Sequence, residues 1–259
     1  MTAAHHINFI RFHYHVTFAI VVLGALLFAR EVTIALWASL FLLYLVFNVL
    51  LYGGIYTLND IADAKSDETH PLKRNRPLPS RRVSLESARF FSLILISAGL
   101  LSAFVIFDIF IFYICVAILV LNIFYTFVAK KIPYLELIAN SATHSLRFLM
   151  GMLLVTDKAA SYLPLLAVFF LALGFACVRR AVEKDVDGWE SRKTLKYYSG
   201  NSLFIIQLLS FAAVAFVSLT DKSIPKAVYL PILALWSIMV FGTYFSKRIR
   251  SLFKAVWTK

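Results

Sequence analysis

The sequence predicts an all-α protein, a polytopic bundle of transmembrane helices. Of its 259 residues, 61% are hydrophobic and only 15% are charged, which is typical of a membrane protein rather than a soluble domain. Apolar windows close to the roughly 20 residues that cross a bilayer as a helix recur along the whole chain. These windows predict eight crossings, at residues 13–29, 33–58, 90–107, 109–128, 135–155, 159–178, 201–220 and 227–246.

The placement of the cations predicts the orientation of these helices. If the N-terminus is cytoplasmic, most of the 26 Lys and Arg residues fall on that same side. Cytoplasmic loops carry an excess of Lys and Arg, so both termini and both long loops are expected to face the cytoplasm, with the protein in a bacterial cytoplasmic membrane. The first apolar segment lacks a cleavage pattern and is expected to remain as an anchor. Topology and contact with the lipid bilayer account for the net charge of +12, so no nucleic-acid partner is expected.

Two loops are longer than a turn, residues 59–89 and 179–200, and each follows the second helix of a block of four. This arrangement predicts one domain over residues 1–259, with halves of about 1–130 and 131–259 around a central cavity. Substrate sites in proteins with such repeats commonly lie between the halves. The two charged loops are therefore candidate sides of one cavity.

The first loop begins with acidic residues, in the stretch "NDIADAKSD". If the second helix continues past Leu58, then Asn59, Asp60, Asp63 and Asp67 share one face of it. Carboxylates this close repel one another unless a cation compensates their charge. Mg²⁺ prefers hard oxygen ligands and usually binds through one or two carboxylates together with substrate phosphates. These four side chains are the predicted metal ligands, and the three aspartates are predicted to be catalytic.

Basic residues follow the aspartates in "THPLKRNRPLP", where the prolines prevent a continuous helix. Lys73, Arg74 and Arg76 are predicted to bind a diphosphate from the side opposite the metal. The alternative is a solvated loop in which acids and bases neutralise one another.

The second charged segment spans residues 179–199. On a helix its residues alternate cation and anion along one stripe, and cations and a tyrosine then follow a break at Gly188. Glu183 and Asp187 are predicted to be catalytic, and the residues predicted to bind substrate here are Arg180, Lys184, Arg192, Lys193 and Tyr197. The alternative is a surface helix with ion pairs.

Three polar residues lie inside the fifth crossing, with spacing i, i+4 and i+7: Asn140, His144 and Arg147. A cation at this depth is costly, so Arg147 is expected to face the bundle interior and have a partner. The stripe is interpreted as lining the substrate cavity, and a structural clamp between helices is the alternative. Arg11 lies before the first helix. Its position is equally consistent with contact with the cavity and with a role as an anchor at the membrane interface.

"NDIADAKSD" followed by "KRNRPLPS" resembles the first aspartate-rich motif and the basic loop of the UbiA superfamily of membrane prenyltransferases. The resemblance implies a helical bundle, usually of nine helices, that binds an isoprenoid diphosphate through Mg²⁺. Asn122 and Tyr125 resemble a polar patch near that family's active site and are further substrate-binding candidates. The family's second motif is commonly D-x-x-x-D, whereas Glu183 and Asp187 give E-x-x-x-D.

The combination of "DETHPLKRNRP", "RRAVE" and "RKTLKYYS" is most similar to the branch of decaprenyl-phosphate phosphoribosyltransferases. That resemblance implies transfer of 5-phosphoribose from phosphoribosyl diphosphate to a polyprenyl phosphate. The extra cations would then bind a second phosphorylated substrate. The alternative is transfer of a polyprenyl group from its diphosphate to an aromatic or other acceptor. The partners expected are an isoprenoid lipid and a diphosphate donor. A membrane transporter is the alternative from another class.

Overall fold

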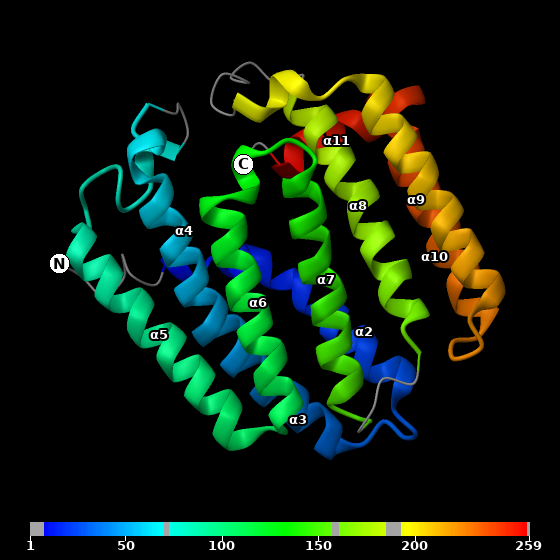
Figure 1. Ribbon diagram of the computed structural model, residues 1–259, viewed down its shortest axis with the longest axis horizontal. Coiled ribbons are helices and arrows are strands. Elements are labelled where there is room, and N and C mark those ends of the chain that lie inside the picture. The colour runs from blue at the N-terminus through cyan, green and yellow to red at the C-terminus, as the bar shows by residue number, and fades with distance from the viewer. Residues whose placement is uncertain (1–7, 70–72, 157–160, 185–192, 258–259) are drawn as a thin grey trace. The chain divides into compact units, whose positions relative to one another are not determined.

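The computed structural model describes residues 8–69, 73–156, 161–184 and 193–257, and every regular element in these ranges is helical (Figure 1). The predicted all-α class is thus confirmed. The chain divides into two compact units, which are described separately here. The first consists of Met1–Phe127 and Arg147–Lys158, and the second of Val128–Leu146 and Ala159–Lys259.

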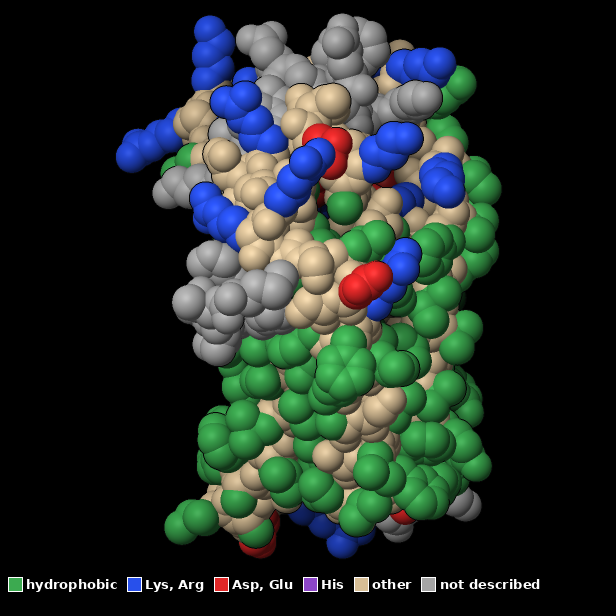
Figure 2. Space-filling model, turned by 90° about the vertical axis from the view of Figure 1, so that its left-hand side faces the viewer, with side chains coloured by type: hydrophobic (Ala, Val, Ile, Leu, Met, Phe, Trp, Pro, Cys, Tyr) green, Lys and Arg blue, Asp and Glu red, His purple; other side chains and the backbone are tan. Residues whose placement is uncertain are grey.

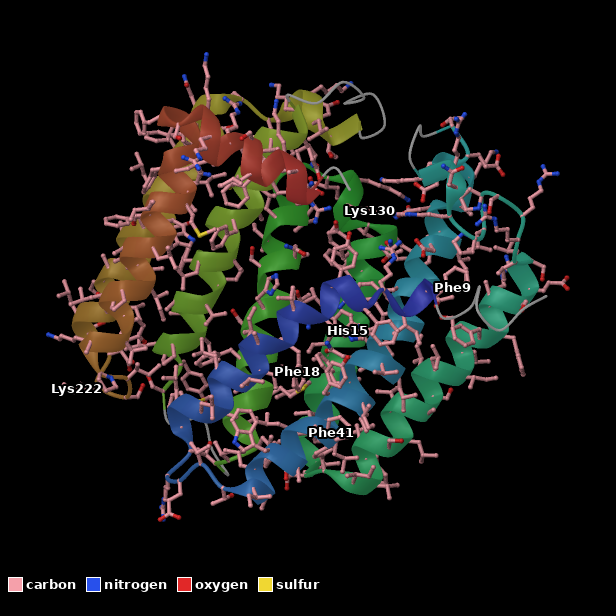
Figure 3. All side chains as sticks on the ribbon, turned by 180° about the vertical axis from the view of Figure 1, so that it is seen from behind. Phe9, His15, Phe18, Phe41, Lys130 and Lys222 are labelled. Atoms are coloured by element: carbon pink, nitrogen blue, oxygen red, sulfur yellow. The ribbon has the colours of Figure 1, made fainter. Side chains whose placement is uncertain are left out.

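The first unit opens with the short 3-10 helices η1 (Asn8–Ile10) and η2 (Phe12–Phe18), which lead into α2 (Ala19–Phe28). Phe9, His15 and Phe18 lie along this segment and are buried (Figure 3). His15 is fixed on both ring nitrogens, because Nδ1 lies 2.8 Å from the Tyr44 hydroxyl and Nε2 lies 3.1 Å from the Ile10 carbonyl oxygen. The N-terminal segment is therefore packed into the first unit.

A single long helix, Ile34–Asp67, carries the acidic motif at its C-terminal end. It is made of α3 (Ile34–Tyr44), the π-helical segment η3 (Leu45–Leu51) and α4 (Tyr52–Asp67). The side chain of Thr33 caps its start by accepting a hydrogen bond from the Leu36 amide at 3.2 Å. The prediction that the second helix continues past Leu58 through the aspartates is confirmed.

A short 3-10 turn, η4 (Lys73–Asn75), follows the aspartates, and α5 (Leu85–Ile106) and α6 (Ile109–Phe127) complete the consecutive helices of this unit. The chain turns tightly between α5 and α6, where the Asp108 side chain accepts a hydrogen bond from the Phe110 amide at 2.8 Å. α5 packs closely on α4, because Gly54 leaves room and its carbonyl oxygen accepts a hydrogen bond from Ser92 at 2.8 Å.

The second unit starts at η5 (Ala129–Lys131) and the first part of α7 (Leu135–Leu153), whose residues from Arg147 onward belong to the first unit. Its other elements are α8 (Leu163–Lys184), η7 (Lys193–Tyr197), α9 (Gly200–Thr220), α10 (Lys226–Phe245) and α11 (Lys247–Trp257). Ser199 begins α9 with a capping box that it shares with Ser202. Trp236 packs against Gly174, and its indole nitrogen donates to the Leu171 carbonyl oxygen at 2.9 Å.

Six helices in the described ranges are long and apolar enough to cross a membrane: Ile34–Asp67, Leu85–Ile106, Ile109–Lys131, Leu163–Lys184, Gly200–Thr220 and Lys226–Phe245. The segment Tyr14–Phe28 is a shorter apolar helix. The face on which α5 lies is hydrophobic over its lower part, and Lys and Arg side chains gather toward its upper end (Figure 2). The exposed hydrophobic side chains of α5 include Phe90, Leu93, Leu101 and Phe104. Such an exterior suits contact with lipid rather than water.

Each of the eight predicted crossings corresponds to a helix whose bounds differ by a few residues at most, apart from the extension of the second and sixth helices toward their charged loops. The described chain also contains α11, a basic amphipathic helix that follows α10 after one residue. Ile249 of this helix lies close to Gly242, and the Phe253 ring centroid lies 6.5 Å from that of Phe175. Counting α11 gives a ninth helix in the described part of the chain, one that packs on α10 and α8.

Candidate functional site

The C-terminal end of α4 holds two buried carboxylates on one face. Asp60 and Asp67 are 5% and 4% exposed, and their separation of seven residues equals about two helical turns. Nη1 of Arg76 lies between them and donates to Asp67 at 2.7 Å and to Asp60 at 3.3 Å. A single cationic group from the basic loop therefore bridges the first and last aspartates of the motif. Asp63 is half-buried on the same helix.

Asp60 has a second cationic partner, Arg11, from the N-terminal segment. The guanidinium carbon of Arg11 also lies 5.8 Å and 5.6 Å from the ring centroids of Tyr14 and Tyr56. The Arg11 backbone is left-handed, with φ 53° and ψ 55°, which is uncommon for a residue other than glycine and often marks functional positions. Of the two interpretations that the sequence allows for Arg11, this contact favours a place in the site.

The other predicted residues of the first charged segment divide into two groups. Nζ of Lys73 lies 3.9 Å from Asp67, and the Asn59 amide oxygen accepts a hydrogen bond from Thr126 of α6 at 3.4 Å. Arg74, by contrast, is exposed. The structure thus brings Lys73 and Arg76 to the aspartates and leaves Arg74 at the surface.

The aspartate end of α4 has the chemistry of a divalent cation site. Two carboxylates share one positively charged group, and carboxylate oxygens are ligands that Mg²⁺ prefers. No cluster of three or more Asp, Glu, His or Cys side chains suited to a metal is present in the described ranges. A metal ion held by Asp60 and Asp67 would therefore replace Arg76 between them.

Arg147 on α7 is buried and is 3% exposed. Its Nη1 donates to the Thr17 hydroxyl at 2.9 Å, and its guanidinium carbon lies 4.1 Å and 5.3 Å from the ring centroids of Tyr52 and Phe47. Within the described parts of the chain no carboxylate forms an ion pair with Arg147, and its buried Nε has no hydrogen-bond partner. A buried charge is costly in a protein unless it is paired.

The remaining predicted polar residues of the helices lie on α6 and α7. Asn122 donates to the Tyr52 hydroxyl at 3.4 Å and to the Ile118 carbonyl oxygen at 2.8 Å, whereas Tyr125 is half-buried. Asn140 and His144 are half-buried on the part of α7 that belongs to the second unit. Asn122 therefore reaches the ring on which Arg147 lies.

The second unit contains a buried acid that the sequence analysis does not identify. Glu136 at the start of α7 is fully buried, and both of its oxygens accept hydrogen bonds from Arg180, at 2.9 Å and 3.0 Å. The Tyr198 hydroxyl donates to the same carboxylate at 2.7 Å. Burial and the hydrogen bond and charge of Glu136 raise the pKa of Tyr198. The sequence signal that could have revealed Glu136 is a single acidic residue in the otherwise uncharged first turns of α7.

Glu183, the first acid of the E-x-x-x-D motif, is paired with cations. It accepts from Nε of Arg179 at 2.9 Å and also pairs with Arg180. Lys184 donates to the Tyr198 carbonyl oxygen at 2.7 Å, and Tyr197 is exposed beside Lys196. Asp187 and Arg192 lie outside the described residues, and so does the side chain of Lys193.

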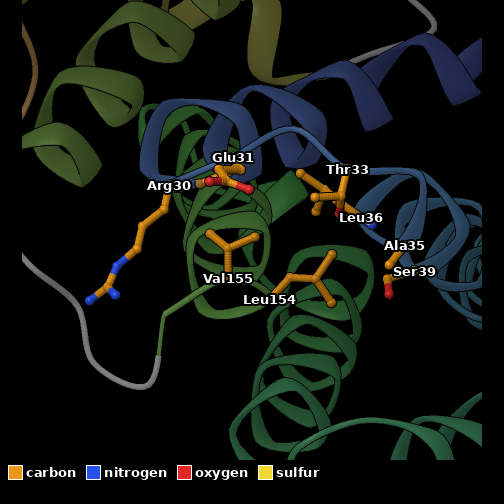
Figure 4. Close-up of a pocket in the computed structure, with 9 residues that line it drawn as sticks. Arg30, Glu31, Thr33, Ala35, Leu36, Ser39, Leu154 and Val155 are labelled. Carbon is orange, nitrogen blue, oxygen red and sulfur yellow. Dashed lines mark hydrogen bonds between the residues drawn. The ribbon is translucent and has the colours of Figure 1, made fainter.

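A pocket of about 320 Å³ lies in the first unit at the N-terminal end of the Ile34–Asp67 helix (Figure 4). Arg30, Glu31, Thr33 and Ser39 line it together with Leu154. The aspartates lie at the opposite end of that helix, so this pocket does not belong to the candidate site.

The family model described as the UbiA prenyltransferase family matches residues 18–257. The chain belongs to the UbiA prenyltransferase family. Its apolar helices and this membership make it an integral membrane protein. Membership of a transferase family favours the enzyme over the transporter.

Curated proteins of similar sequence match part of the chain. A digeranylgeranylglyceryl phosphate synthase from Methanococcus aeolicus is 32% identical over 170 residues, which cover 62% of this chain and 56% of the relative. Nodulation protein NoeC from Azorhizobium caulinodans is 32% identical over 149 residues, covering 57% and 47%. The match thus spans about half the length of these relatives.

Solved UbiA homologues share the fold along almost the whole chain. A homologue from Archaeoglobus fulgidus bound to GPP and Mg²⁺ has a TM-score of 0.77 at 18% identity, covering 97% of this chain and 95% of its own. The apo structure of a homologue from Aeropyrum pernix K1 has a TM-score of 0.70 at 19% identity, covering 94% of each chain. Within the UbiA superfamily, the comparisons support prenyl transfer better than the phosphoribosyl transfer expected first.

Proposed function

We propose that this UbiA-family protein is a Mg²⁺-dependent transferase that moves a prenyl group from an isoprenoid diphosphate to an acceptor within the membrane. The observation that carries the proposal is the pair of buried aspartates, Asp60 and Asp67, that share the cation of Arg76 at the end of a membrane helix. Solved homologues bound to Mg²⁺ together with GPP or DMAPP support the choice of metal and donor.

The acidic face of α4 would bind the metal ion, and the nearby cationic side chains would bind the diphosphate of the donor. Asn59, Asp60, Asp63 and Asp67 would hold Mg²⁺, which supplies positive charge to the leaving diphosphate. Arg76 and Lys73 are already beside the aspartates and would donate to the diphosphate oxygens. Arg11 reaches the same carboxylate from the N-terminal segment and would donate from the other side.

The reaction then exchanges one bond for another at carbon 1 of the prenyl group. The bond from this carbon to the diphosphate oxygen breaks, and the electron pair leaves with the diphosphate. The arginines and Lys73 stabilise the charge that develops on that leaving group. The acceptor atom forms the new bond to carbon 1 and releases its proton.

Phosphoribosyl transfer to a polyprenyl phosphate is the second candidate, and the excess of cations around Glu183 favours it. Glu183 pairs with both Arg179 and Arg180, and Lys184 follows it directly. A cationic second segment suits a reaction in which both substrates carry phosphate.

The two candidates separate in a transfer assay with the purified full chain in lipid nanodiscs. Labelled GPP, a longer prenyl diphosphate and labelled phosphoribosyl diphosphate are each supplied with lipid acceptors, with Mg²⁺ or with EDTA. We expect Mg²⁺-dependent transfer of the prenyl label. Asp60→Asn and Asp67→Asn should each lower the rate at least about 100-fold, a loss typical of removing a charge-stabilising group.

Asp108→Asn is the matched control, because Asp108 is an exposed aspartate in the turn between α5 and α6. This variant should keep full activity. Transfer only from phosphoribosyl diphosphate would select the second candidate. Consumption of neither donor would contradict both enzyme proposals, and uptake of the same labelled compounds into sealed vesicles would then indicate a transporter.

A further inference from the structure

Arg147 carries a buried positive charge for which the described chain provides no counter-ion. It is 3% exposed, and its one hydrogen bond goes to the neutral hydroxyl of Thr17. Its Nε is buried without a hydrogen-bond partner. Buried charges in proteins are normally paired, so a buried guanidinium without an ion pair suits a counter-ion supplied by a ligand.

The diphosphate of the donor does not account for that charge. Arg147 lies over the Tyr52 ring, and Tyr52 is eight residues before Asp60 on the regular helix α4. At 1.5 Å per residue, this separation is about 12 Å along the helix axis. In the proposed reaction Asp60, Asp67 and Arg76 would hold the donor's diphosphate at the far end of that distance. This separation favours a second anion near Tyr52.

The surroundings of Arg147 suit a polar group attached to an apolar body. The rings of Phe47 and Tyr52 lie beside the guanidinium, and Asn122 donates to the Tyr52 hydroxyl. Asn48, next to Phe47 in the chain, is 2% exposed and its side-chain oxygen has no hydrogen-bond partner. An unpartnered donor and an unpartnered acceptor thus occur in the same region of the first unit, and Asn48 lies in the π-helical segment. Such segments are frequent at functional sites.

The charge of Arg147 also argues against contact with the reacting end of the prenyl group. Departure of the diphosphate leaves carbon 1 of the prenyl group electron-poor, and a nearby uncompensated cation would raise the energy of this state by repulsion. An anion bound to Arg147 would neutralise the cation and remove this repulsion. The positive charge is thus compatible with the reaction only when the second substrate neutralises it.

We infer that Arg147 binds the anionic group of the acceptor, a phosphate or a carboxylate, and thereby selects negatively charged acceptors over uncharged ones. This inference rests on the proposed transfer from a diphosphate donor. It adds a substrate class for the acceptor and makes Arg147 a specificity-determining residue.

The test compares pairs of acceptors that differ only in charge. A polyprenyl phosphate is paired with its polyprenol, a prenylglyceryl phosphate with its diol, and an aromatic carboxylic acid with its amide. KM for acceptor and donor and kcat are measured for the wild type, Arg147→Gln and Arg147→Lys in nanodiscs. In Arg147→Gln, KM for the charged acceptor should rise about tenfold or more, as expected for loss of a charge-assisted hydrogen bond, while KM for the donor stays unchanged. Arg147→Lys should recover part of that loss.

Thr17→Val distinguishes recognition from a clamp between helices. It removes the hydrogen-bond partner of Arg147 and keeps the cation. If Arg147 only joins the two segments, Thr17→Val and Arg147→Gln will change melting temperature and acceptor KM alike. If Arg147 binds the acceptor, Thr17→Val will keep the acceptor KM within about twofold.

The outcomes separate this inference from the proposed function. Transfer by the wild type with a preference for charged acceptors that disappears in Arg147→Gln supports the inference. A preference that survives in Arg147→Gln, or a wild type that prefers uncharged acceptors, overturns it and leaves the transfer reaction standing. If no donor is consumed, the proposed function fails by itself. The inference is then tested by measuring melting temperature with and without added polyprenyl phosphate. The added lipid must raise the melting temperature of the wild type and leave that of Arg147→Gln unchanged.

Discussion

Arg180 donates two hydrogen bonds to the fully buried carboxylate of Glu136, from Nε at 2.9 Å and from Nη2 at 3.0 Å. This planar two-bond geometry is the one in which Arg binds a carboxylate best. The pair joins α7 to α8, and the Tyr198 hydroxyl adds a third donor from the chain that leads into α9. Three segments of the second unit are thus tied to one carboxylate.

Removing either member of this pair should destabilise the second unit. Arg180→Met leaves the buried carboxylate of Glu136 without its cation, which typically costs about 3–5 kcal/mol. Glu136→Gln should cost less, because Arg180 keeps its pairing with Glu183. The check is thermal unfolding of the purified variants in detergent. Arg179→Met is the control, because Arg179 pairs with Glu183 at the surface, where an exposed pair contributes only about 0–1 kcal/mol. Equal losses for Arg179 and Arg180 variants would contradict this account.

Alkaline pH should weaken the protein through Tyr198. Its pKa is raised in the folded state by burial and by Glu136, so the folded chain retains the phenol proton at a pH where the unfolded chain loses it. The contribution is complete below the unfolded pKa of about 10 and is lost as pH rises above it. Melting temperature should therefore fall more steeply above pH 10 in the wild type than in Tyr198→Phe. Parallel curves for the two proteins would argue against a raised pKa.

Mg²⁺ and Arg76 should compete for the same carboxylates. Arg76→Met leaves Asp60 and Asp67 with fewer cationic partners, so this variant should melt at a lower temperature than the wild type when no divalent cation is present. Added Mg²⁺ should raise its melting temperature more than that of the wild type, because a ligand that binds the folded state more tightly stabilises it more at the same concentration. Arg74→Met, which changes an exposed cation of the same loop, should behave as the wild type. A Mg²⁺ response identical in all three proteins would show that Arg76 does not occupy the metal position.

The close contact between α4 and α5 should not tolerate a side chain at Gly54. A Cβ there would lie 2.6 Å from the Ile96 side chain and 2.9 Å from backbone atoms of Ile96 and Ser92. Gly54→Ala should cost about 1–3 kcal/mol through overpacking. Gly200→Ala is the control, because nothing lies within 4 Å of its added Cβ at the start of α9. Unfolding in detergent measures both, and a stable Gly54→Ala protein would refute the packing shown here.

The fold was accessible from the sequence because its signals are local. The length of apolar stretches gives the helices, and a period of 3.6 residues places Asp60 and Asp67 on one face well before any tertiary contact is known. The cationic loop that supplies Arg76 was predictable for the same reason, since it begins within a few residues of the aspartates.

The partners that come from far along the chain were not predictable in this way. Arg11 lies 49 residues from Asp60, and Glu136 lies 44 residues from Arg180. No periodic pattern connects residues so distant, and a lone charge beside an apolar helix suits an interfacial anchor equally well. Arg180 contacts Glu183 on its own helix and Glu136 on α7 at the same time. The contact with Glu136 depends on how α7 packs against α8, which the sequence does not reveal.

The π-helical segment Leu45–Leu51 divides the long helix Ile34–Asp67 into two rotational registers. Hydrogen bonds in this segment span five residues instead of four, so it accommodates one residue more than an α-helix of equal rise. One residue corresponds to about 100° of rotation. On a single helical wheel, the buried stripe of α3 is therefore not continuous with the stripe of α4 that carries Asp60. Deleting one residue between Leu45 and Leu51 would remove the extra residue, so that the two stripes would continue one another along a regular α-helix.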